Sequence, residues 1–132
     1  MMAFGKITAT VLIVQDLNKV MTFYRDVLGL PPTFNDDVSY GFKLGDQDLV
    51  VLQVSAAIEM TGEPAISLTA GVNHTMMPCI NCDDIDATYN ELTAKGLNFI
   101  KPPKDQAWGR RTAYFADPEG HLWELYQELP AK

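Results

Sequence analysis

One pattern of residues occurs twice in the chain, at a spacing of 68 positions. Residues 7–14 are β-branched and apolar, and Asp16 follows them as a cap for a helix over residues 17–28. Gly29 then ends the helix, because glycine adopts the left-handed conformation at low cost. The equivalent positions of the second half are residues 76–82, Asp84, residues 85–95 and Gly96. A repeat of this length predicts two small modules that share one topology.

Each half continues with apolar, β-branched segments that are separated by turn residues. These predicted strands are residues 38–44 and 49–54 in the first half, and residues 111–116 and 122–127 in the second. A further short strand is expected near Phe34 in one half and near residues 99–100 in the other. Each half therefore predicts the order βαβββ, and the expected fold class is α+β with two tandem βαβββ modules.

The expected domain organisation is a single domain over residues 1–132. Module one covers about residues 5–54 and module two about residues 74–129. Between them, residues 55–73 contain Gly62, Pro64 and Gly71, which favour a loop, so this segment is expected to be a linker.

The charge balance excludes several classes of partner. Lys and Arg total 10 against 17 Asp and Glu, which gives a net charge of −7. Nucleic acids and anionic membrane surfaces bind cationic proteins, so neither is an expected partner. The sequence has no apolar run long enough to span a bilayer, and residues 1–10 lack the features of a signal peptide. Two cysteines cannot form a disulfide scaffold, so the expected location is the cytoplasm.

Three motifs resemble those of the glyoxalase, bleomycin-resistance and extradiol-dioxygenase superfamily, also called vicinal oxygen chelate proteins. They are Asp16-Leu17 with Phe23-Tyr24 and Leu28-Gly29-Leu30, then Asp83-Asp84-Ile85-Asp86-Ala87 with Gly96, and finally Phe115-Ala116-Asp117-Pro118-Glu119-Gly120-His121-Leu122-Trp123-Glu124-Leu125. The resemblance implies paired modules that form an open, incompletely closed barrel-like cavity, commonly completed in a homodimer. It does not select an activity, because the superfamily contains lyases, isomerases, dioxygenases and drug-binding proteins.

Metal-dependent members of that superfamily bind the ion through side chains on the first and last strands of each module. The resemblance transfers these places to Ala9, Met77 and Glu124. Matching Leu49 and Leu52 to Leu122 and Leu125 adds Val51 to the set. A divalent ion needs three or four converging donors, and only Glu124 supplies one that suits a hard or borderline metal. The expectation is therefore no metal and no cofactor.

The alternative is a divalent metal ion held by Glu124, His74 and a residue of the facing module. His74 lies three residues before Met77, on the opposite face of a continuous strand, so a bulge or a later start of the strand would be needed. The second histidine, His121, follows a Pro-Glu-Gly turn and is expected at the solvated surface. The pattern Cys79-Ile80-Asn81-Cys82 lies at a strand end rather than at a helix start, which favours small buried residues over a redox pair.

Glu124 has two interpretations of equal weight. It is either a cavity carboxylate that binds a cationic group or acts as a catalytic base, or a residue hydrogen-bonded to Arg110, Arg111 or Tyr126 without a catalytic task. Trp108 is a candidate for stacking on a planar ligand. Strand alternation puts Leu122 and Tyr126 on the face of Glu124, and Trp123 and Leu125 on the other face, beneath a helix. The predicted ligand-binding residues are Ala9, Val51, Met77, Trp108, Leu122, Glu124 and Tyr126.

These observations favour a homodimeric, metal-free protein that binds a small organic molecule in an apolar cavity. The ligand is expected to be cationic and antibiotic-like, because the chain is acidic and resembles the bleomycin-resistance branch. The alternative is a metal-dependent lyase, isomerase or dioxygenase of the same superfamily. A third hypothesis is a dimer with an interaction or regulatory role and a vestigial cavity.

Overall fold

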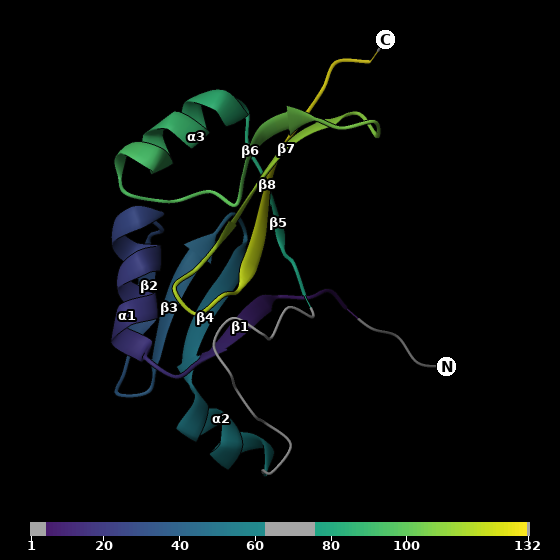
Figure 1. The fold of residues 1–132 in the computed structure, drawn as a ribbon. Coiled ribbons are helices and arrows are strands. Elements are labelled where there is room, and N and C mark those ends of the chain that lie inside the picture. The colour runs from purple at the N-terminus through teal and green to yellow at the C-terminus, as the bar shows by residue number, and fades with distance from the viewer. Residues whose placement is uncertain (1–4, 63–75, 132) are drawn as a thin grey trace. The chain divides into compact units, whose positions relative to one another are not determined.

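A computed structural model describes residues 5–62 and 76–131 of the chain. The chain divides into two compact units, Met1–Leu68 and Thr69–Lys132. Each unit contains one four-stranded sheet with helices packed on it (Figure 1). This arrangement confirms the predicted fold class, α+β with two βαβββ modules.

The sheet of the first unit has the strand order β1-β4-β3-β2. β1 and β4 pair in parallel, whereas β3 pairs in antiparallel fashion with both β4 and β2. The parallel pair requires a crossover between the strands, and a helix supplies part of it. The strands are β1 (Ala9–Val14), β2 (Pro32–Asn35), β3 (Ser39–Leu44) and β4 (Gln47–Gln53).

The first helix begins as predicted and then changes its geometry. Asp16 caps α1 (Leu17–Thr22), and its side chain accepts a hydrogen bond of 3.1 Å from the backbone N–H of Lys19. From Phe23 the chain continues as the π-helix η1 (Phe23–Val27), with a bond from the N–H of Leu28 to the carbonyl of Phe23. The predicted helix over residues 17–28 is therefore present, but its second half has π geometry, which the sequence did not indicate. The wider turn brings the neighbouring residues Phe23 and Tyr24 into the core together.

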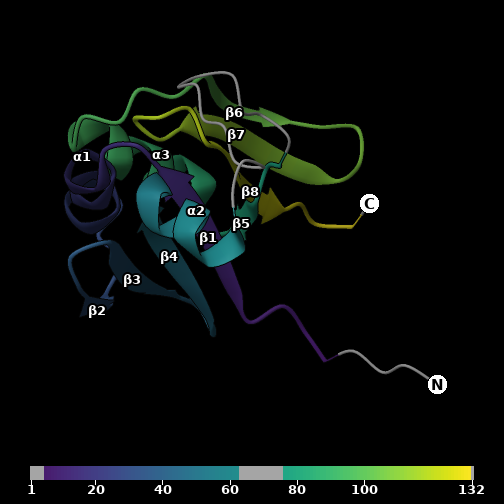
Figure 2. The ribbon, with the colours of Figure 1, turned by 90° about the horizontal axis from the view of Figure 1, so that it is seen from below.

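A helix that the sequence analysis did not predict occupies the start of the expected linker. α2 (Val54–Thr61) follows β4 directly and ends at Gly62, whose N–H bonds to the carbonyl of Ile58. Ala57 is its one buried residue. Figure 2 shows α2 beside β1. The rest of the expected linker, residues 63–73, lies outside the described residues.

The second unit repeats the topology with the strand order β5-β8-β7-β6. Asp84 caps α3 (Ile85–Ala94) through a 3.1 Å bond from the N–H of Ala87, as the repeat predicts. β5 pairs in parallel with β8, and β7 lies antiparallel between β8 and β6. The strands are β5 (Cys79–Asn81), β6 (Lys101–Asp105), β7 (Arg110–Ala116) and β8 (Leu122–Glu128).

Aromatic contacts join each helix to its own sheet. In the first unit Tyr24 of η1 lies 6.2 Å from Phe42 of β3, measured between ring centroids. In the second unit the aromatic chain runs from Tyr89 of α3 through Phe99 and Phe115 to Trp123 of β8, at 4.6, 5.8 and 6.3 Å. Trp123 and Leu125 are buried, and the aromatic contacts that link Trp123 to α3 confirm that their face of β8 lies beneath a helix. Among the described residues, no helix is long and apolar enough to cross a membrane.

Candidate functional site

The first sheet has one face covered by α1 and η1 and an opposite face that is partly open. Leu49 and Val51 of β4 belong to the covered face, with Phe42 and Tyr24, and all four are fully or almost fully buried. Successive residues of a strand alternate between faces, so Val50 and Leu52 belong to the opposite face. Val11 of β1 pairs with Val50 and shares that face.

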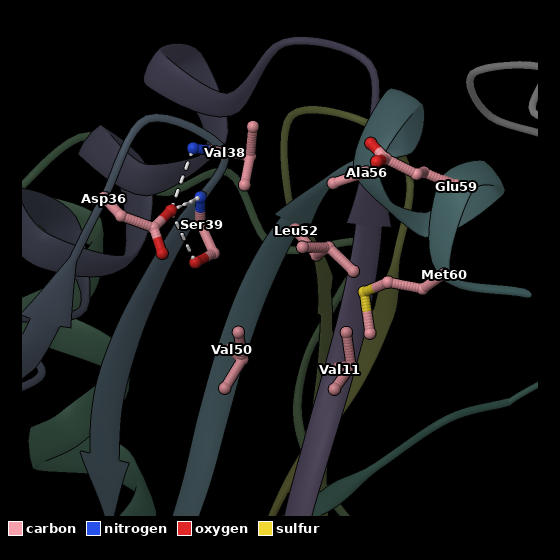
Figure 3. Close-up of a pocket in the computed structure, with 9 residues that line it drawn as sticks. All are labelled: Val11, Asp36, Val38, Ser39, Val50, Leu52, Ala56, Glu59 and Met60. Atoms are coloured by element: carbon pink, nitrogen blue, oxygen red, sulfur yellow. Dashed lines mark hydrogen bonds between the residues drawn. The ribbon is translucent and has the colours of Figure 1, made fainter.

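A pocket of ≈ 650 Å³ lies on this second face of the first sheet (Figure 3). Its floor consists of Val11, Val50 and Leu52, and α2 forms one wall, from which Met60 points towards Val11. The opposite wall comes from the segment that enters β3. The nine lining residues are Val11, Asp36, Val38, Ser39, Val50, Leu52, Ala56, Glu59 and Met60. A largely apolar pocket of this volume with a few polar groups is typical of small-molecule sites.

Asp36 is a polar residue of the pocket whose side chain is held by hydrogen bonds within its own turn. Its Oδ1 accepts hydrogen bonds from the N–H of Val38 at 2.9 Å, the N–H of Ser39 at 2.8 Å and the hydroxyl of Ser39 at 2.9 Å. The Val38 N–H and the Ser39 hydroxyl hold the pKa of Asp36 below its usual value. The carboxylate is therefore charged and held in place by its own turn.

The hydrogen-bond ladder of the two sheets corrects one predicted position. Cys79 pairs with Glu124 in the second sheet, and Val11, which is 68 residues before Cys79, pairs with Val50 in the first. The residue equivalent to Glu124 is therefore Val50 and not Val51. Matching the leucines of β4 and β8 displaced the alignment by one residue, which is enough to exchange the faces of a strand. Val51 is fully buried on the helix-covered side.

Glu124 lies on the corresponding face of the second sheet and is 7% exposed. Its Oε1 accepts a hydrogen bond of 2.8 Å from the hydroxyl of Tyr114, the residue opposite it on β7. The expected partners were Arg110, Arg111 and Tyr126, so the sequence analysis missed this contact. A hydrogen bond with Thr112 lowers the pKa of Tyr114, but burial and Glu124 outweigh it and the pKa is raised.

Cys79 of β5 pairs with Glu124 of β8. Cys79 and Cys82 are both free thiols. Partial desolvation of the sulfur raises the pKa of the Cys79 thiol, and the Glu124 carboxylate raises it further. Burial is also the main cause of the raised pKa of Cys82. Both thiols are therefore protonated and weakly reactive near neutral pH. Cys79 is exposed and not buried as predicted, because short β5 begins at this residue.

The same face continues towards the end of β8 with paired polar groups. The guanidinium of Arg110 lies 4.0 Å from the centroid of the Tyr126 ring and donates a 3.0 Å bond to Glu128. Next to them, the side-chain amide of Gln106 donates a 3.0 Å bond to the hydroxyl of Thr112, which is buried. Tyr126 thus has a cation against one side of its ring.

The other predicted site residues lie at strand ends and in a turn. Ala9 is exposed at the start of β1, Met77 is exposed just before β5, and Leu122 is half-buried at the start of β8. Trp108 is 64% exposed in the turn between β6 and β7. His74 lies outside the described residues.

His121 is not a solvated surface residue as predicted. Its Nδ1 lies 2.7 Å from Oδ2 of Asp117, whose carboxylate is buried in the turn before β8. Asp117 also accepts hydrogen bonds from the N–H groups of Glu119 and His121. The contacts between Asp117 and His121 therefore hold the turn before β8, and His121 has a structural role there.

The described residues do not fit the metal centre that the resemblance suggests. The corrected set of four places is Ala9, Val50, Met77 and Glu124, and Glu124 alone offers an oxygen donor that suits a divalent ion. Within residues 5–62 and 76–131, no three His, Cys, Asp or Glu side chains form a group that could hold a metal ion.

Three lining residues of the pocket and the partner of Glu124 were not predicted from the sequence. Glu59 and Met60 were assigned to a linker, and their position depends on the unpredicted helix α2. Asp36 had a local signal, since an aspartate followed after three positions by serine is typical of a turn closed by side-chain hydrogen bonds. Tyr114 could have been found from the pairing of β7 with β8 across the turn at residues 117–120.

Comparison with known proteins identifies the family. The sequence profile of the Glyoxalase/Bleomycin resistance protein/Dioxygenase superfamily matches residues 6–125. A protein of Bacillus subtilis described as uncharacterized protein YraH is 32% identical over 121 residues, covering 89% of this chain and 94% of its own length. A probable lactoylglutathione lyase of Vibrio parahaemolyticus is 30% identical over 135 residues, covering 98% of this chain and 96% of its own.

A further relative and a solved structure support the same family. The fosfomycin resistance protein FosX of Listeria innocua is 29% identical over 118 residues and covers 87% of this chain and 84% of its own length. The crystal structure of a glyoxalase/bleomycin resistance protein/dioxygenase from Nocardioides superposes with a TM-score of 0.88 at 27% identity, covering 100% of this chain and 89% of its own. The chain therefore belongs to the Glyoxalase/Bleomycin resistance protein/Dioxygenase superfamily.

Proposed function

We propose that the chain binds a small organic molecule, without a metal ion, in the pocket on the open face of its first sheet. The observation that carries this proposal is the position of Val50. It is the residue equivalent to Glu124, and its side chain lines an apolar pocket together with Val11, Leu52 and Met60. A place that could have held a metal ligand contributes apolar surface instead.

The lining supports binding by burial of apolar surface. A ligand that buries about 200 Å² of apolar surface gains about 5 kcal/mol from the transfer out of water. Loss of translational and rotational freedom offsets much of this gain, so small ligands are expected to bind in the micromolar to millimolar range.

The proposal also includes ligand contacts in the second module. Glu124, Leu122, Tyr126 and Trp108 are proposed as contacts for a ligand in the second module, where Glu124 would accept a hydrogen bond from it. Assembly as a homodimer in the cytoplasm completes the proposal. Size-exclusion chromatography with light scattering at low protein concentration tests the dimer.

The pocket is tested by filling it from an exposed strand position. Val11 is 49% exposed, and aromatic residues are favoured in strands, so Val11→Trp is expected to fold and to occupy the pocket. Ile7→Trp is the matched control, because Ile7 is exposed in the same unit and does not line the pocket. The neutral probe naphthylethanol is titrated into each protein by calorimetry and by amide NMR.

The proposal predicts shifts of the amide signals of Val50, Leu52 and Met60 when naphthylethanol binds. Binding is expected to be lost in Val11→Trp and kept in Ile7→Trp. Equal binding by the two variants would place the probe elsewhere and contradict the proposed pocket.

A metal-dependent lyase is the second candidate function. Similarity to a probable lactoylglutathione lyase over almost the whole chain favours it, as does the carboxylate of Glu124. Metal analysis of protein purified without a histidine tag distinguishes the two candidates. A near-stoichiometric divalent metal, together with formation of lactoylglutathione from methylglyoxal and glutathione, would establish the lyase and overturn the metal-free proposal.

A further inference from the structure

We propose that the ligand of the first-sheet pocket is a flat organic cation and that Asp36 is the residue that selects its charge. This inference rests on the proposed function and adds the chemical class of the ligand and the residue that recognises it. It is carried by the hydrogen bonds of Asp36, the charges of the lining and the position of one aromatic ring.

The turn around Asp36 prepares one carboxylate oxygen for a ligand. All three hydrogen bonds that hold the side chain reach Oδ1, from Val38 and Ser39 (Figure 3). Within residues 5–62, no hydrogen bond to Oδ2 is present. Oδ2 therefore keeps its capacity to accept a hydrogen bond, on a side chain that needs no rearrangement when a donor arrives.

The charge of the lining has one sign. Asp36 and Glu59 are acidic, and none of the nine lining residues is Lys, Arg or His. The remaining lining residues are apolar except for Ser39, whose hydroxyl is already donated to Asp36. An anionic ligand would meet like charge without a compensating cation, whereas a cationic ligand finds a fixed carboxylate. The net charge of −7 also favours the approach of a cation.

Phe34 supplies an aromatic surface next to the pocket floor. In the sheet, Phe34 pairs with Gly41, Gly41 with Val50, and Val50 with Val11, so these residues form one row on the same face. The ring of Phe34 lies where a side chain of Gly41 would be, and a Cβ at this position would collide with it. The missing side chain thus leaves room for the Phe34 ring over Gly41, the residue between Phe34 and Val50 in this row. Phe34 is 46% exposed, so a planar group that reaches beyond the pocket lining can stack on it.

The test uses three naphthalene probes of similar size and different charge: naphthylethylamine, which is cationic, naphthylethanol, which is neutral, and naphthylacetate, which is anionic. Asp36→Asn is the main variant, because the amide oxygen can still accept the three bonds that close the turn while the charge is removed. Asp37→Asn removes the same charge from the next residue, which does not line the pocket.

The wild-type protein is expected to bind the amine about threefold more tightly than the alcohol, the effect of one ion pair with an exposed carboxylate. This preference is expected to vanish in Asp36→Asn and to remain in Asp37→Asn, with all three proteins showing the same circular dichroism. Glu59→Gln, on the exposed side of α2, is expected to reduce the preference by a smaller factor.

Each other result has a definite meaning. Equal affinity of the wild-type protein for amine and alcohol, or an unchanged preference in Asp36→Asn, overturns the assignment of charge selection while the proposed binding function stands. A preference that depends on Glu59 alone overturns Asp36 as the selecting residue. Failure of all three probes to bind at millimolar concentration overturns the proposed function itself.

Discussion

Tyr114→Phe removes one hydroxyl from the second sheet and leaves the ring in place. The hydroxyl donates to a Glu124 carboxylate that is 7% exposed, at 2.8 Å. A hydrogen bond to a charged group contributes about 1.5–3 kcal/mol to stability. Its removal costs this whole contribution where water cannot replace the donor. We expect the free energy of unfolding to fall by about 2 kcal/mol. With a urea m-value of about 2 kcal/mol/M, the midpoint falls by about 1 M.

The assay is urea unfolding followed by tryptophan fluorescence, with Tyr126→Phe as the matched control. Tyr126 lies next but one to Glu124 on β8, and its ring contact with Arg110 does not need the hydroxyl, so a change below about 0.5 kcal/mol is expected. In a Glu124→Gln background, Tyr114→Phe should cost only about 1 kcal/mol, because the bond is then between neutral groups. An equal cost in both backgrounds would refute the reasoning.

The remaining predictions concern Gly41 and Cys79. Gly41→Ala drives the Phe34 ring from its place, so stability is expected to fall by about 1–3 kcal/mol, measured by thermal unfolding; an unchanged melting temperature would show that the ring is free to move. Partial desolvation and Glu124 raise the pKa of Cys79, so the thiolate fraction falls and alkylation by iodoacetamide is slow at neutral pH. Glu124→Gln should therefore accelerate alkylation of Cys79 relative to Cys82, measured by mass spectrometry. An unchanged alkylation rate of Cys79 in this variant would contradict the effect of Glu124 on the thiol.

Local signals explain which parts of the fold could be predicted. Asp16 and Asp84 each accept a bond from an N–H three residues later, so a few neighbouring residues determine where each helix begins. The turns at residues 45–46 and 117–120 are likewise encoded by Gly, Asp and Pro. Because these signals repeat at one spacing, the order βαβββ follows for both halves without knowledge of long-range contacts.

The face assignment in β4 needed a contact that is distant in sequence. Residues 49–52 are Leu, Val, Val and Leu, so both faces of the strand are apolar and alternation cannot tell them apart. In β8, by contrast, Glu124 between Trp123 and Leu125 marks the faces, and the assignment there is correct. The pairing of β4 with β1 and β3, in which Val50 lies between Val11 and Gly41, determines the register in the first sheet.

The pocket was missed for a related reason. α2 has eight residues and a single buried one, so the apolar periodicity that identifies a longer helix is absent. Its helical state depends on its contacts with β1 and β4, which no local pattern records. Since Glu59 and Met60 belong to this helix, one wall of the candidate site could not be placed from the sequence.

The two open sheet faces differ although the modules share a topology. In the first module the central pair is Val11 and Val50, and the polar groups of the site lie outside the sheet, on Asp36 and α2. In the second module the same pair is Cys79 and Glu124, and Glu124 is already bonded to Tyr114. Glu124 is also buried, whereas Asp36 is exposed and accepts its three bonds through Oδ1, so that within residues 5–62 Oδ2 has no donor and stays accessible to a ligand. Recognition of a ligand by charge is therefore expected in the first module, whereas Glu124 in the second module is expected to stabilise the fold and to offer a ligand a hydrogen-bond acceptor.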